Sequence, residues 1–322
     1  MSVSIALCTY NGQRFIREQI DSYLYQTIQP DEIVVCDDGS LDDTINIVKQ
    51  YVATHPQIQW RVVQNEQTLG TNRNFEVAIG LCTGDLIFFS DQDDIWARDK
   101  IEIMRSFFEQ NPECNGAFSN GSLIDESGRE FQDTLLDHCF FKAGIRKKYL
   151  KDELLYQSIL LGNIITGATM CIRRRMLSTI IPFHLELRRK LWWDGWIGFC
   201  LLATGQVGYI DKSLIKYRIH KGQQVGISSD NDSFEDYLLK GKYLESLVKE
   251  YFQRYLIAYS FMQQLKAVAG IPAGIENRIT REYLTHRKKY FEAQSFFKKK
   301  LRLLKWHIQG INYISFKDLL TL

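Results

Sequence analysis

The sequence predicts an α/β fold, built around a mostly parallel sheet with helices on its faces. Short apolar segments alternate with segments of helical periodicity between residues 3 and 89. Strands and helices that alternate in this way, joined by short connections, are typical of a doubly wound parallel sheet. The apolar segments 32–36 and 86–89 also run directly into acidic residues. Because ligands of such sheets bind over the carboxyl ends of the strands, these acidic residues are candidate functional groups.

Four apolar segments are predicted to form strands, at residues 3–8, 32–36, 60–63 and 86–89. The last of them reads Leu-Ile-Phe-Phe, without the alternation of polar and apolar residues that marks a strand with one solvated face. A continuous apolar run of this length is typical of a strand buried on both faces. The sequence therefore predicts a central sheet that is covered by helices on both sides.

Four helices are predicted around these strands. Apolar residues recur at helical spacing in the first two helices, at positions 16, 20 and 24 and at positions 45, 48 and 52. A third helix is predicted over residues 71–81, and a fourth is predicted to begin near Asp99. Asp42 or Asp43 is expected to cap the second helix, because a short acidic side chain can accept hydrogen bonds from the first free backbone amides.

The fourth predicted strand runs into three acidic residues, Asp91, Asp93 and Asp94. Carboxylates grouped at a strand end favour Mg²⁺ or Mn²⁺, hard cations that prefer oxygen ligands and keep positions open for phosphate oxygens. The alternative is a solvated acidic turn in front of the next helix. The carboxyl edge of the sheet should also bring Tyr10 and Asp38 close to Asp93.

The composition is ordinary for a folded protein of 322 residues, with 45% hydrophobic residues, 24% charged residues and a net charge of +2. This net charge gives no reason to expect nucleic acid as a partner. The seven cysteines are scattered without Cys-x-x-Cys spacing, which favours a reduced, cytoplasmic compartment. We find neither a signal-peptide pattern nor a run of about 18 uncharged apolar residues, so no membrane-spanning helix is expected.

Six short motifs follow one another between residues 3 and 226. They are Cys-Thr-Tyr-Asn-Gly from Cys8, Asp-Asp-Gly-Ser from Asp37, the segment 65–74, Ser-Asp-Gln-Asp-Asp-Ile-Trp from Ser90, Trp-Trp-Asp-Gly-Trp from Trp192 and Tyr-Arg-Ile-His from Tyr217. In order and spacing, these motifs resemble those of family 2 glycosyltransferases with the GT-A fold, and most of all those of bacterial rhamnosyltransferases. The resemblance implies a Rossmann-like sheet flanked by helices and a nucleotide-sugar donor.

The resemblance also implies roles for individual residues. Thr9, Tyr10 and Asp38 would contact the base and the ribose of the nucleotide. Arg73 would approach the diphosphate, and so would Arg218, for which a surface ion pair is the alternative. The complete set of residues expected to bind the nucleotide sugar is Thr9, Tyr10, Asn11, Asp38, Arg73, Asp91, Trp193 and Arg218.

A metal ion and a catalytic base complete the expected site. By the resemblance, Asp93 or Asp94 would hold Mg²⁺ or Mn²⁺, with His220 as a further ligand or a contact to the diphosphate. A divalent cation there stabilises the charge that develops on the leaving group. Asp194 takes the place of the base that accepts the proton of the attacking hydroxyl. Three tryptophans stand close to Asp194 in the sequence, and desolvation by their rings would raise its basicity, although core packing is the alternative role for these rings.

The chain changes character near residue 228. A polar segment separates the expected catalytic domain, residues 1–228, from a region of long helical patterns at residues 229–322. Within this region, basic residues alternate with aromatic residues from 287 to 306. This pattern is typical of a helix that lies on an anionic membrane surface. The alternative is a helix that packs on the catalytic domain and turns its basic face to solvent.

These observations predict an inverting, metal-dependent glycosyltransferase. One carboxylate base and no protein nucleophile imply in-line attack, which inverts the anomeric centre. The expected reaction moves L-rhamnose from dTDP-L-rhamnose onto a lipid-linked or growing surface polysaccharide at the cytoplasmic face of the cell membrane. There are two alternatives: a UDP-sugar as the donor, and a catalytically inactive GT-A domain that serves as a binding or scaffold subunit.

Overall fold

The computed structural model describes residues 1–138, 165–183, 192–204 and 206–223, and eight single positions between 259 and 288. The chain divides into two compact units, Met1–Ser229 and Asp230–Leu322. Nearly all of the predicted helical region after residue 228, including most of the basic and aromatic segment, lies outside the described residues. The described helices and strands therefore belong almost entirely to the first unit.

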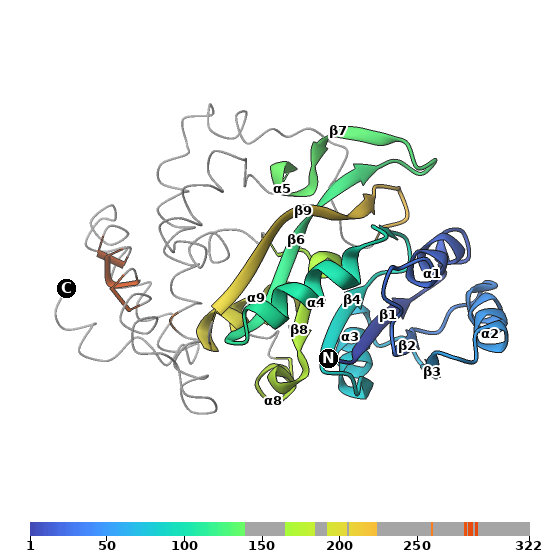
Figure 1. Ribbon diagram of the computed structural model, residues 1–322, viewed down its shortest axis with the longest axis horizontal. Coiled ribbons are helices and arrows are strands. Elements are labelled where there is room, and N and C mark those ends of the chain that lie inside the picture. Colours follow the sequence, from blue (N-terminus) through green and yellow to red (C-terminus); the bar gives the residue numbers. More distant parts are fainter. Residues whose placement is uncertain are drawn as a thin grey trace, which may run out of the picture. The chain divides into compact units, whose positions relative to one another are not determined.

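The first half of this unit forms a parallel sheet with the strand order β3-β2-β1-β4 (Figure 1). All four predicted strands and the helices between them are confirmed. The elements are β1 (Val3–Thr9), α1 (Ile16–Leu24), β2 (Glu32–Asp37), α2 (Thr44–Thr54), β3 (Gln59–Gln64), α3 (Thr71–Leu81) and β4 (Leu86–Ser90). Asp43 is the N-cap residue of α2, and Asp42 Oδ1 accepts a hydrogen bond of 3.0 Å from the Thr44 amide.

The second half extends the sheet in the order β4-β8-β6-β9-β5, with β7 paired to β6. Its elements are β5 (Ile95–Trp96), α4 (Lys100–Gln110), β6 (Cys114–Ile124), β7 (Glu130–Thr134), α5 (Leu135–His138), η1 (Gly167–Thr169), β8 (Met170–Arg173), η2 (Arg174–Met176), α8 (Leu177–Ile180), α9 (Trp193–Thr204) and β9 (Gln206–Arg218). Strand β8 runs antiparallel to both β4 and β6, whereas β6 and β9 are parallel. The sheet is thus parallel over its first four strands and mixed beyond them.

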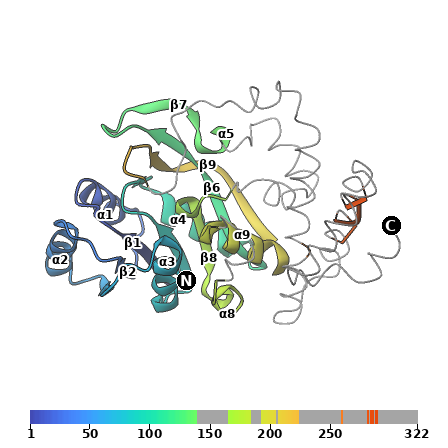
Figure 2. The same ribbon diagram turned by 180° about the vertical axis from the view of Figure 1, so that it is seen from behind.

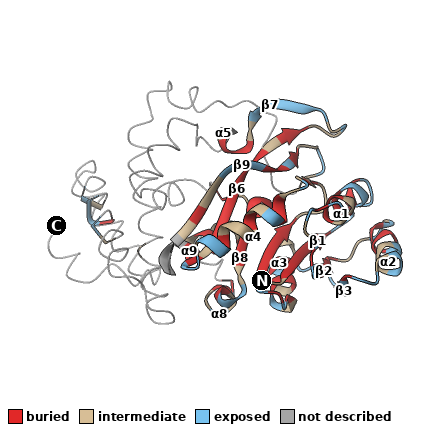
Figure 3. Ribbon diagram, in the orientation of Figure 1, coloured by how far each residue is buried: buried red, intermediate tan, exposed pale blue. Residues whose placement is uncertain are grey.

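The core follows the sheet. Every residue of β1, β2 and β4 is buried, as the continuous apolar run of β4 predicts. Figure 3 shows the buried strands in the middle of the unit and the exposed residues on the outer helices. Helix α3 packs on β1 and β2 and also contacts α9, and both helices lie in front of the sheet in Figure 2. Burial on both faces leaves the carboxyl ends of the strands as the edge that can receive a ligand.

The described helices include none that is both long enough and apolar enough to cross a membrane.

Candidate active site

A cavity of about 570 Å³ lies over the carboxyl ends of β1, β2 and β4. It brings together residues that are far apart in the sequence, from the first turn after β1 to the residues that follow β9. Of the residues predicted for the site, those that line the cavity are Thr9, Tyr10, Asn11, Asp38, Asp91, Asp93, Trp193, Asp194 and His220. Three others, Arg73, Asp94 and Arg218, are not part of its lining.

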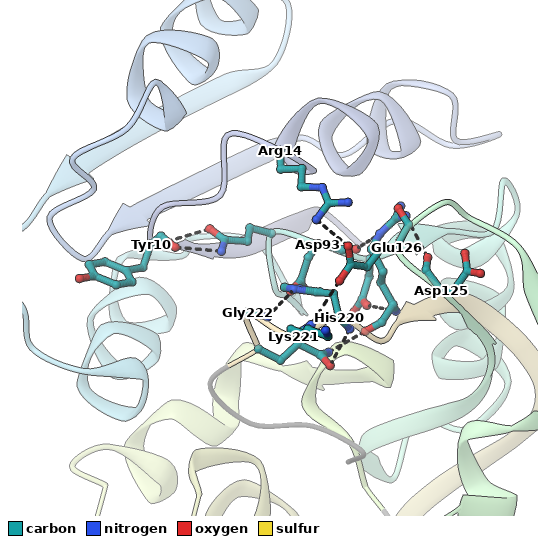
Figure 4. Close-up of polar contacts among 12 residues, drawn as sticks. Tyr10, Arg14, Asp93, Asp125, Glu126, His220, Lys221 and Gly222 are labelled. Carbon is teal, nitrogen blue, oxygen red and sulfur yellow. Dashed lines mark hydrogen bonds and ion pairs between the residues drawn. The ribbon is translucent and has the colours of Figure 1, made fainter. Parts of the chain in front are cut away.

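Tyr10 is held at the cavity wall by Gln92. The Gln92 amide donates a hydrogen bond of 3.0 Å to the Tyr10 carbonyl and accepts one of 2.8 Å from the Tyr10 amide (Figure 4). The Tyr10 ring itself is 36% exposed and is therefore free to contact a ligand. Gly12 makes this clamp possible, because a Cβ at that position would overlap the Gln92 side chain. The clamp joins the first turn to the acidic loop between β4 and β5.

Asn11 forms the turn that follows β1. Its φ of 50° lies in the left-handed region, which asparagine tolerates better than most residues. The Asn11 amide donates to Ser40 Oγ at 2.8 Å, and Asn11 Oδ1 accepts from the Leu41 amide at 2.8 Å. The loops after β1 and β2 are thus fastened to each other along one side of the cavity.

Asp38 lines the cavity and organises the loop before α3. Its carboxylate accepts hydrogen bonds from the amides of Leu69 and Gly70, at 2.7 and 2.9 Å, and from Asn65 Nδ2 at 3.0 Å. Gly70 has a φ of 82°, so a glycine suits this position. The neighbouring carboxylate of Asp37 does not line the cavity. It is fully buried and accepts a hydrogen bond of 2.7 Å from the Thr9 hydroxyl.

Asp93 and His220 form a close pair at the cavity wall. The distance between Asp93 Oδ2 and His220 Nε2 is 2.8 Å (Figure 4). His220 Nδ1 accepts a hydrogen bond of 3.2 Å from the Gly222 amide, which assigns the proton of the neutral ring to Nε2. The imidazole therefore donates to the Asp93 carboxylate in this state. For Nε2 to bind a metal, the neutral ring would have to carry its proton on Nδ1 instead, which would give up the hydrogen bond from the Gly222 amide.

Asp91 is partly buried at the cavity wall. Burial first, and then the negative charges of Asp93 and Asp194, together raise its pKa to about 8. A cation bound beside Asp91 and Asp93 would favour the ionised forms of these two carboxylates. The cavity thus has a marked preference for positive charge at this point.

Asp94 points away from the cavity. It is 1% exposed, and its Oδ1 accepts a hydrogen bond of 3.0 Å from the Arg218 amide, whereas its Oδ2 has no hydrogen-bond partner among the described residues. Burial, followed by the charges of Asp93 and Asp91, raises the pKa of this carboxyl well above its usual value. Of the two residues that the sequence offered as the main metal ligand, Asp93 is the one that faces the cavity.

Arg218 is buried behind the cavity and holds three segments together. Its Nε donates to the Asp93 carbonyl at 2.8 Å, its Nη2 pairs with the Glu18 carboxylate at 2.6 Å, and its Nη1 donates to the carbonyls of Asp125 and Glu126 at 3.4 and 3.3 Å. The guanidinium is 1% exposed, so neither a direct contact with the nucleotide nor a surface ion pair describes its place here. Its contacts fix the acidic loop, α1 and the β6–β7 turn relative to one another.

Arg73 lies on the outer side of α3. Its Nη1 pairs with Glu76 Oε1 at 2.7 Å, and its side chain is 60% exposed. The Glu76 side chain is only 8% exposed, so the pair draws the Arg73 guanidinium toward a buried carboxylate of the same helix. The guanidinium therefore lies outside the cavity lining in this arrangement.

Asp194 lies in the first turn of α9, across the cavity from the β1 turn. Its Oδ1 accepts a hydrogen bond of 2.7 Å from the Gly195 amide, and its Oδ2 accepts one of 3.3 Å from the Gly167 amide. The neighbouring Trp193 ring stacks on Phe75 with a centroid distance of 3.9 Å. Gly167 leaves room for this ring, because a Cβ there would overlap it. The packing of Trp193 and the hydrogen bonds from two amides thus fix the orientation of the Asp194 carboxylate.

The cavity offers a partial set of ligands for a divalent cation. Among the residues that the structure describes, no three His, Cys, Asp or Glu side chains gather closely enough to hold a metal on their own. Asp93 and His220 offer one carboxylate and one imidazole at the same point, a pair that suits Mn²⁺ and, through the carboxylate, Mg²⁺. Such a partial ligand set fits a cation that completes its coordination with water and with the oxygens of a diphosphate.

Three charged residues of the cavity wall were not predicted from the sequence: Arg14, Glu126 and Lys221. Arg14 Nη1 pairs with Glu126 Oε2 at 2.7 Å, and the Lys221 amide lies 3.4 Å from Glu126 Oε1 (Figure 4). Lys221 could have been found, because it directly follows the Tyr-Arg-Ile-His motif. Glu126 lies in the turn between two strands that sequence patterns did not identify, so only the fold brings it to the cavity.

Comparisons with known proteins agree with this architecture. Residues 4–179 match the family model described as glycosyl transferase family 2. The dTDP-rhamnosyl transferase RfbG of Shigella flexneri is 28% identical over 235 residues, which cover 68% of this chain and 73% of that protein. Two solved structures are similar in fold. TarS 1-349 of S. aureus in complex with UDP-GlcNAc has a TM-score of 0.54 and 19% identity, over 97% of this chain and 89% of that one. The mannosyltransferase PcManGT of Pyrobaculum calidifontis, in complex with GDP-Man and Mn²⁺, has a TM-score of 0.52 and 15% identity, over 95% and 79% of the two chains.

Proposed function

Because the chain belongs to glycosyl transferase family 2, and is a glycosyltransferase with the GT-A fold that uses a nucleotide sugar, we propose that it works by a metal-dependent, inverting mechanism. The observation that supports this proposal best is the composition of the cavity. A carboxylate and an imidazole meet at one wall, in Asp93 and His220, and a separate carboxylate, Asp194, lies at another. One group of residues can thus receive the leaving diphosphate while a different residue serves the acceptor.

In the proposed reaction, Asp93 and His220 would hold a divalent cation, and the diphosphate of the donor would supply further oxygen ligands. When bound, this cation would offset the negative charge that the diphosphate gains as the sugar leaves. Asp91 lines the same cavity, and its carboxyl, whose pKa is raised by burial and by the charge of Asp93, would ionise more readily with the cation in place. The Mn²⁺ in the PcManGT structure supports the choice of metal by analogy only.

Asp194 is proposed as the general base. Its carboxylate lines the cavity and accepts hydrogen bonds from the amides of Gly167 and Gly195, which fix its direction. A base so placed can accept the proton of an acceptor hydroxyl as the hydroxyl attacks the anomeric carbon. Attack with one base and no protein nucleophile inverts the configuration of that carbon.

We propose L-rhamnose from dTDP-L-rhamnose as the donor, and a UDP-sugar is the second candidate. The likeness to the dTDP-rhamnosyl transferase RfbG supports the first donor. The UDP-GlcNAc in the TarS complex supports the second. A saccharide of a lipid-linked or growing surface polysaccharide is the proposed acceptor in either case.

The experiment that tests the function measures transfer and donor hydrolysis with both donors, with and without a chelator. Activity should disappear with the chelator and return with Mg²⁺ or Mn²⁺. The donor that supports turnover distinguishes the two candidates. Full activity in the chelator would contradict the metal-dependent mechanism, and the absence of any nucleotide binding would contradict the enzymatic role itself, as expected for an inactive scaffold subunit.

A peripheral contact with the cytoplasmic face of the membrane remains part of the proposal. It is supported by the basic and aromatic residues between 287 and 306, most of which lie outside the described residues. Each basic residue near an anionic surface contributes about 1 kcal/mol, so binding to anionic vesicles should weaken steeply with salt. Salt-independent flotation with such vesicles would favour packing of this segment on protein instead.

A further inference from the structure

The strongest unassigned feature of the cavity is the ion pair between Arg14 and Glu126. Both residues line the cavity, and the Arg14 Nη1 to Glu126 Oε2 distance is 2.7 Å. The other oxygen of the same carboxylate, Oε1, lies 3.4 Å from the amide of Lys221. Lys221 directly follows His220, so the ion pair is next to the point where the diphosphate of the donor is proposed to bind (Figure 4).

This ion pair is built to be exchangeable. The side chains of Arg14 and Glu126 are 61% and 39% exposed, and exposed pairs contribute little to the stability of a fold. The pKa of Glu126 is lowered, first by the hydrogen bond from Arg14 and then by the one from the Lys221 amide, so the carboxylate is ionised at neutral pH. A guanidinium prefers bidentate partners such as phosphate, which carries more charge than one carboxylate.

The backbone that carries Glu126 is fixed, in contrast to its side chain. Arg218 donates to the carbonyls of Asp125 and Glu126, and the Asp125 side chain accepts hydrogen bonds from Ser127 at 2.9 and 2.6 Å. The turn between β6 and β7 is therefore anchored to the same buried arginine that supports the acidic loop. A carboxylate on a fixed turn can hold Arg14 at the cavity wall and yet let it go without a change in the fold.

We propose that Arg14 is a phosphate-binding residue for the donor, and that Glu126 occupies its guanidinium in the empty enzyme and is displaced by the incoming diphosphate. The displacement would also free the Lys221 amide, which is a second donor for a phosphate oxygen. The proposal rests on the proposed function, since it needs a nucleoside diphosphate in this cavity. In this proposal Glu126 competes with the diphosphate for Arg14. Removal of the Arg14 charge should therefore weaken diphosphate binding, whereas removal of the Glu126 charge should strengthen it.

The test measures the affinities of UDP, dTDP and uridine for the full-length protein with Mn²⁺ present, by calorimetry. Arg14→Gln should weaken binding of the tighter nucleoside diphosphate about ten- to hundredfold, because a charge-assisted hydrogen bond is lost. Glu126→Gln should strengthen it by up to about fivefold, because an exposed ion pair no longer has to be broken. The double variant should resemble Arg14→Gln, and uridine, which has no phosphate, should bind all variants alike.

Two substitutions outside the cavity serve as matched controls. Arg17→Gln removes an arginine from the same helix region, and Glu130→Gln removes an exposed glutamate that pairs with Lys216 at 2.7 Å. Both should bind the nucleoside diphosphate as the wild type does.

Several outcomes would overturn the proposal. Unchanged affinity in Arg14→Gln would show that Arg14 does not bind phosphate. Weaker binding in Glu126→Gln would mean that Glu126 orients Arg14 and does not compete for it. An equal loss of uridine binding in Arg14→Gln would place Arg14 against the nucleoside. Failure of the wild type to bind either UDP or dTDP is a separate result, which would overturn the proposed function as well.

Discussion

Asp93 and Asp94 are neighbours in the sequence, yet they meet different environments. Asp93 faces the cavity and pairs with His220, whereas Asp94 is buried and accepts the amide of Arg218. Asp93 lies in a bend and Asp94 directly precedes β5, so one of two consecutive carboxylates can serve a ligand while the other serves the fold. The sequence alone could not decide between them, because the decision depends on which side of the loop the rest of the sheet covers.

This difference gives the first prediction. Asp93→Asn should reduce Mn²⁺-dependent affinity for a nucleoside diphosphate about tenfold or more with little change in stability, because it removes a charged ligand and no core contact. Asp94→Ala should instead destabilise the fold by about 1–3 kcal/mol, because the buried Arg218 amide loses its acceptor, and should retain metal-dependent binding. Calorimetric titration and urea unfolding of both variants test the assignment. The reverse pattern would make Asp94 the ligand.

The second residue-scale prediction concerns Asp194. Asp194→Asn keeps the shape of the side chain and one acceptor oxygen but removes the proton acceptor, so turnover should fall about 10²-fold or more while donor affinity stays nearly constant. Loss of one amide hydrogen bond should cost about 1 kcal/mol of stability. Transfer rate, donor dissociation constant and melting temperature are measured on the one variant. Transfer close to the wild-type rate would exclude Asp194 as the base.

Sequence patterns predicted which segments meet at the site, but they did not predict what each residue of those segments contacts. Tyr10, Asp38 and Asp93 converge as strand ends in a parallel sheet must. Arg218 was expected either to bind the nucleotide or to form a surface ion pair, and its burial in the fold is a third outcome. Gln92 was not singled out, because its bonds to the Tyr10 backbone depend on how two loops meet.

At the scale of elements, short-range periodicity predicted the first half of the sheet well. Helix α3 has the predicted bounds, Thr71–Leu81, and α4 begins one residue after its predicted start at Asp99. The second half depends on pairing between distant segments. Strand β8 enters between β4 and β6, although it follows both of them in the sequence. No local period encodes such an insertion, because the pairing of strands is decided by tertiary contacts.

Element η1 allows a prediction at this scale. Gly167→Ala should overlap the Trp193 ring and shift the amide that holds Asp194, which should cost about 1–3 kcal/mol of stability and reduce turnover. Gly80→Ala in α3 is the matched control. Its Cβ would meet Ile181 Cδ1 at an ordinary 3.6 Å, and alanine favours a helix over glycine by about 0.5–1 kcal/mol. If both substitutions changed turnover equally, the position of the Gly167 amide in η1 would have no specific effect on catalysis.

At the scale of the whole molecule, buried charge couples stability to pH. Lys100 is fully buried beneath the acidic loop, where its Nζ donates to the Ala168 carbonyl at 2.6 Å and lies 3.9 Å from the centroid of the Trp96 ring. Burial lowers its pKa to about 7, although the charge of Asp94 acts in the opposite direction. The hydrogen bond of this amine connects the start of α4 to η1, which lie on two sides of the site. Its protonation therefore affects the stability of the entire unit.

The last prediction follows from this lowered pKa. Below about pH 7, Lys100 is protonated in the folded and the unfolded chain, so it adds no pH dependence; between about 7 and about 10.4, only the unfolded chain keeps the proton. More protons bound by the unfolded state mean that stability rises with pH in this window. The unfolding free energy of the wild type, relative to that of Lys100→Met, should therefore increase from pH 7 to pH 9, by at most about 1.4 kcal/mol per pH unit.

Urea unfolding at several pH values measures this slope. Ile101→Val is the control, because it removes buried volume from the same helix without a titrating group and should shift the curve by about 0.5–1.5 kcal/mol while it keeps the wild-type slope. Asp91, whose raised pKa acts with the opposite sign below about pH 8, is present in all three proteins and largely cancels in the comparison. Parallel curves for the wild type and Lys100→Met would mean that the buried ammonium stays charged across this range, held by Asp94, and that burial alone does not set its protonation.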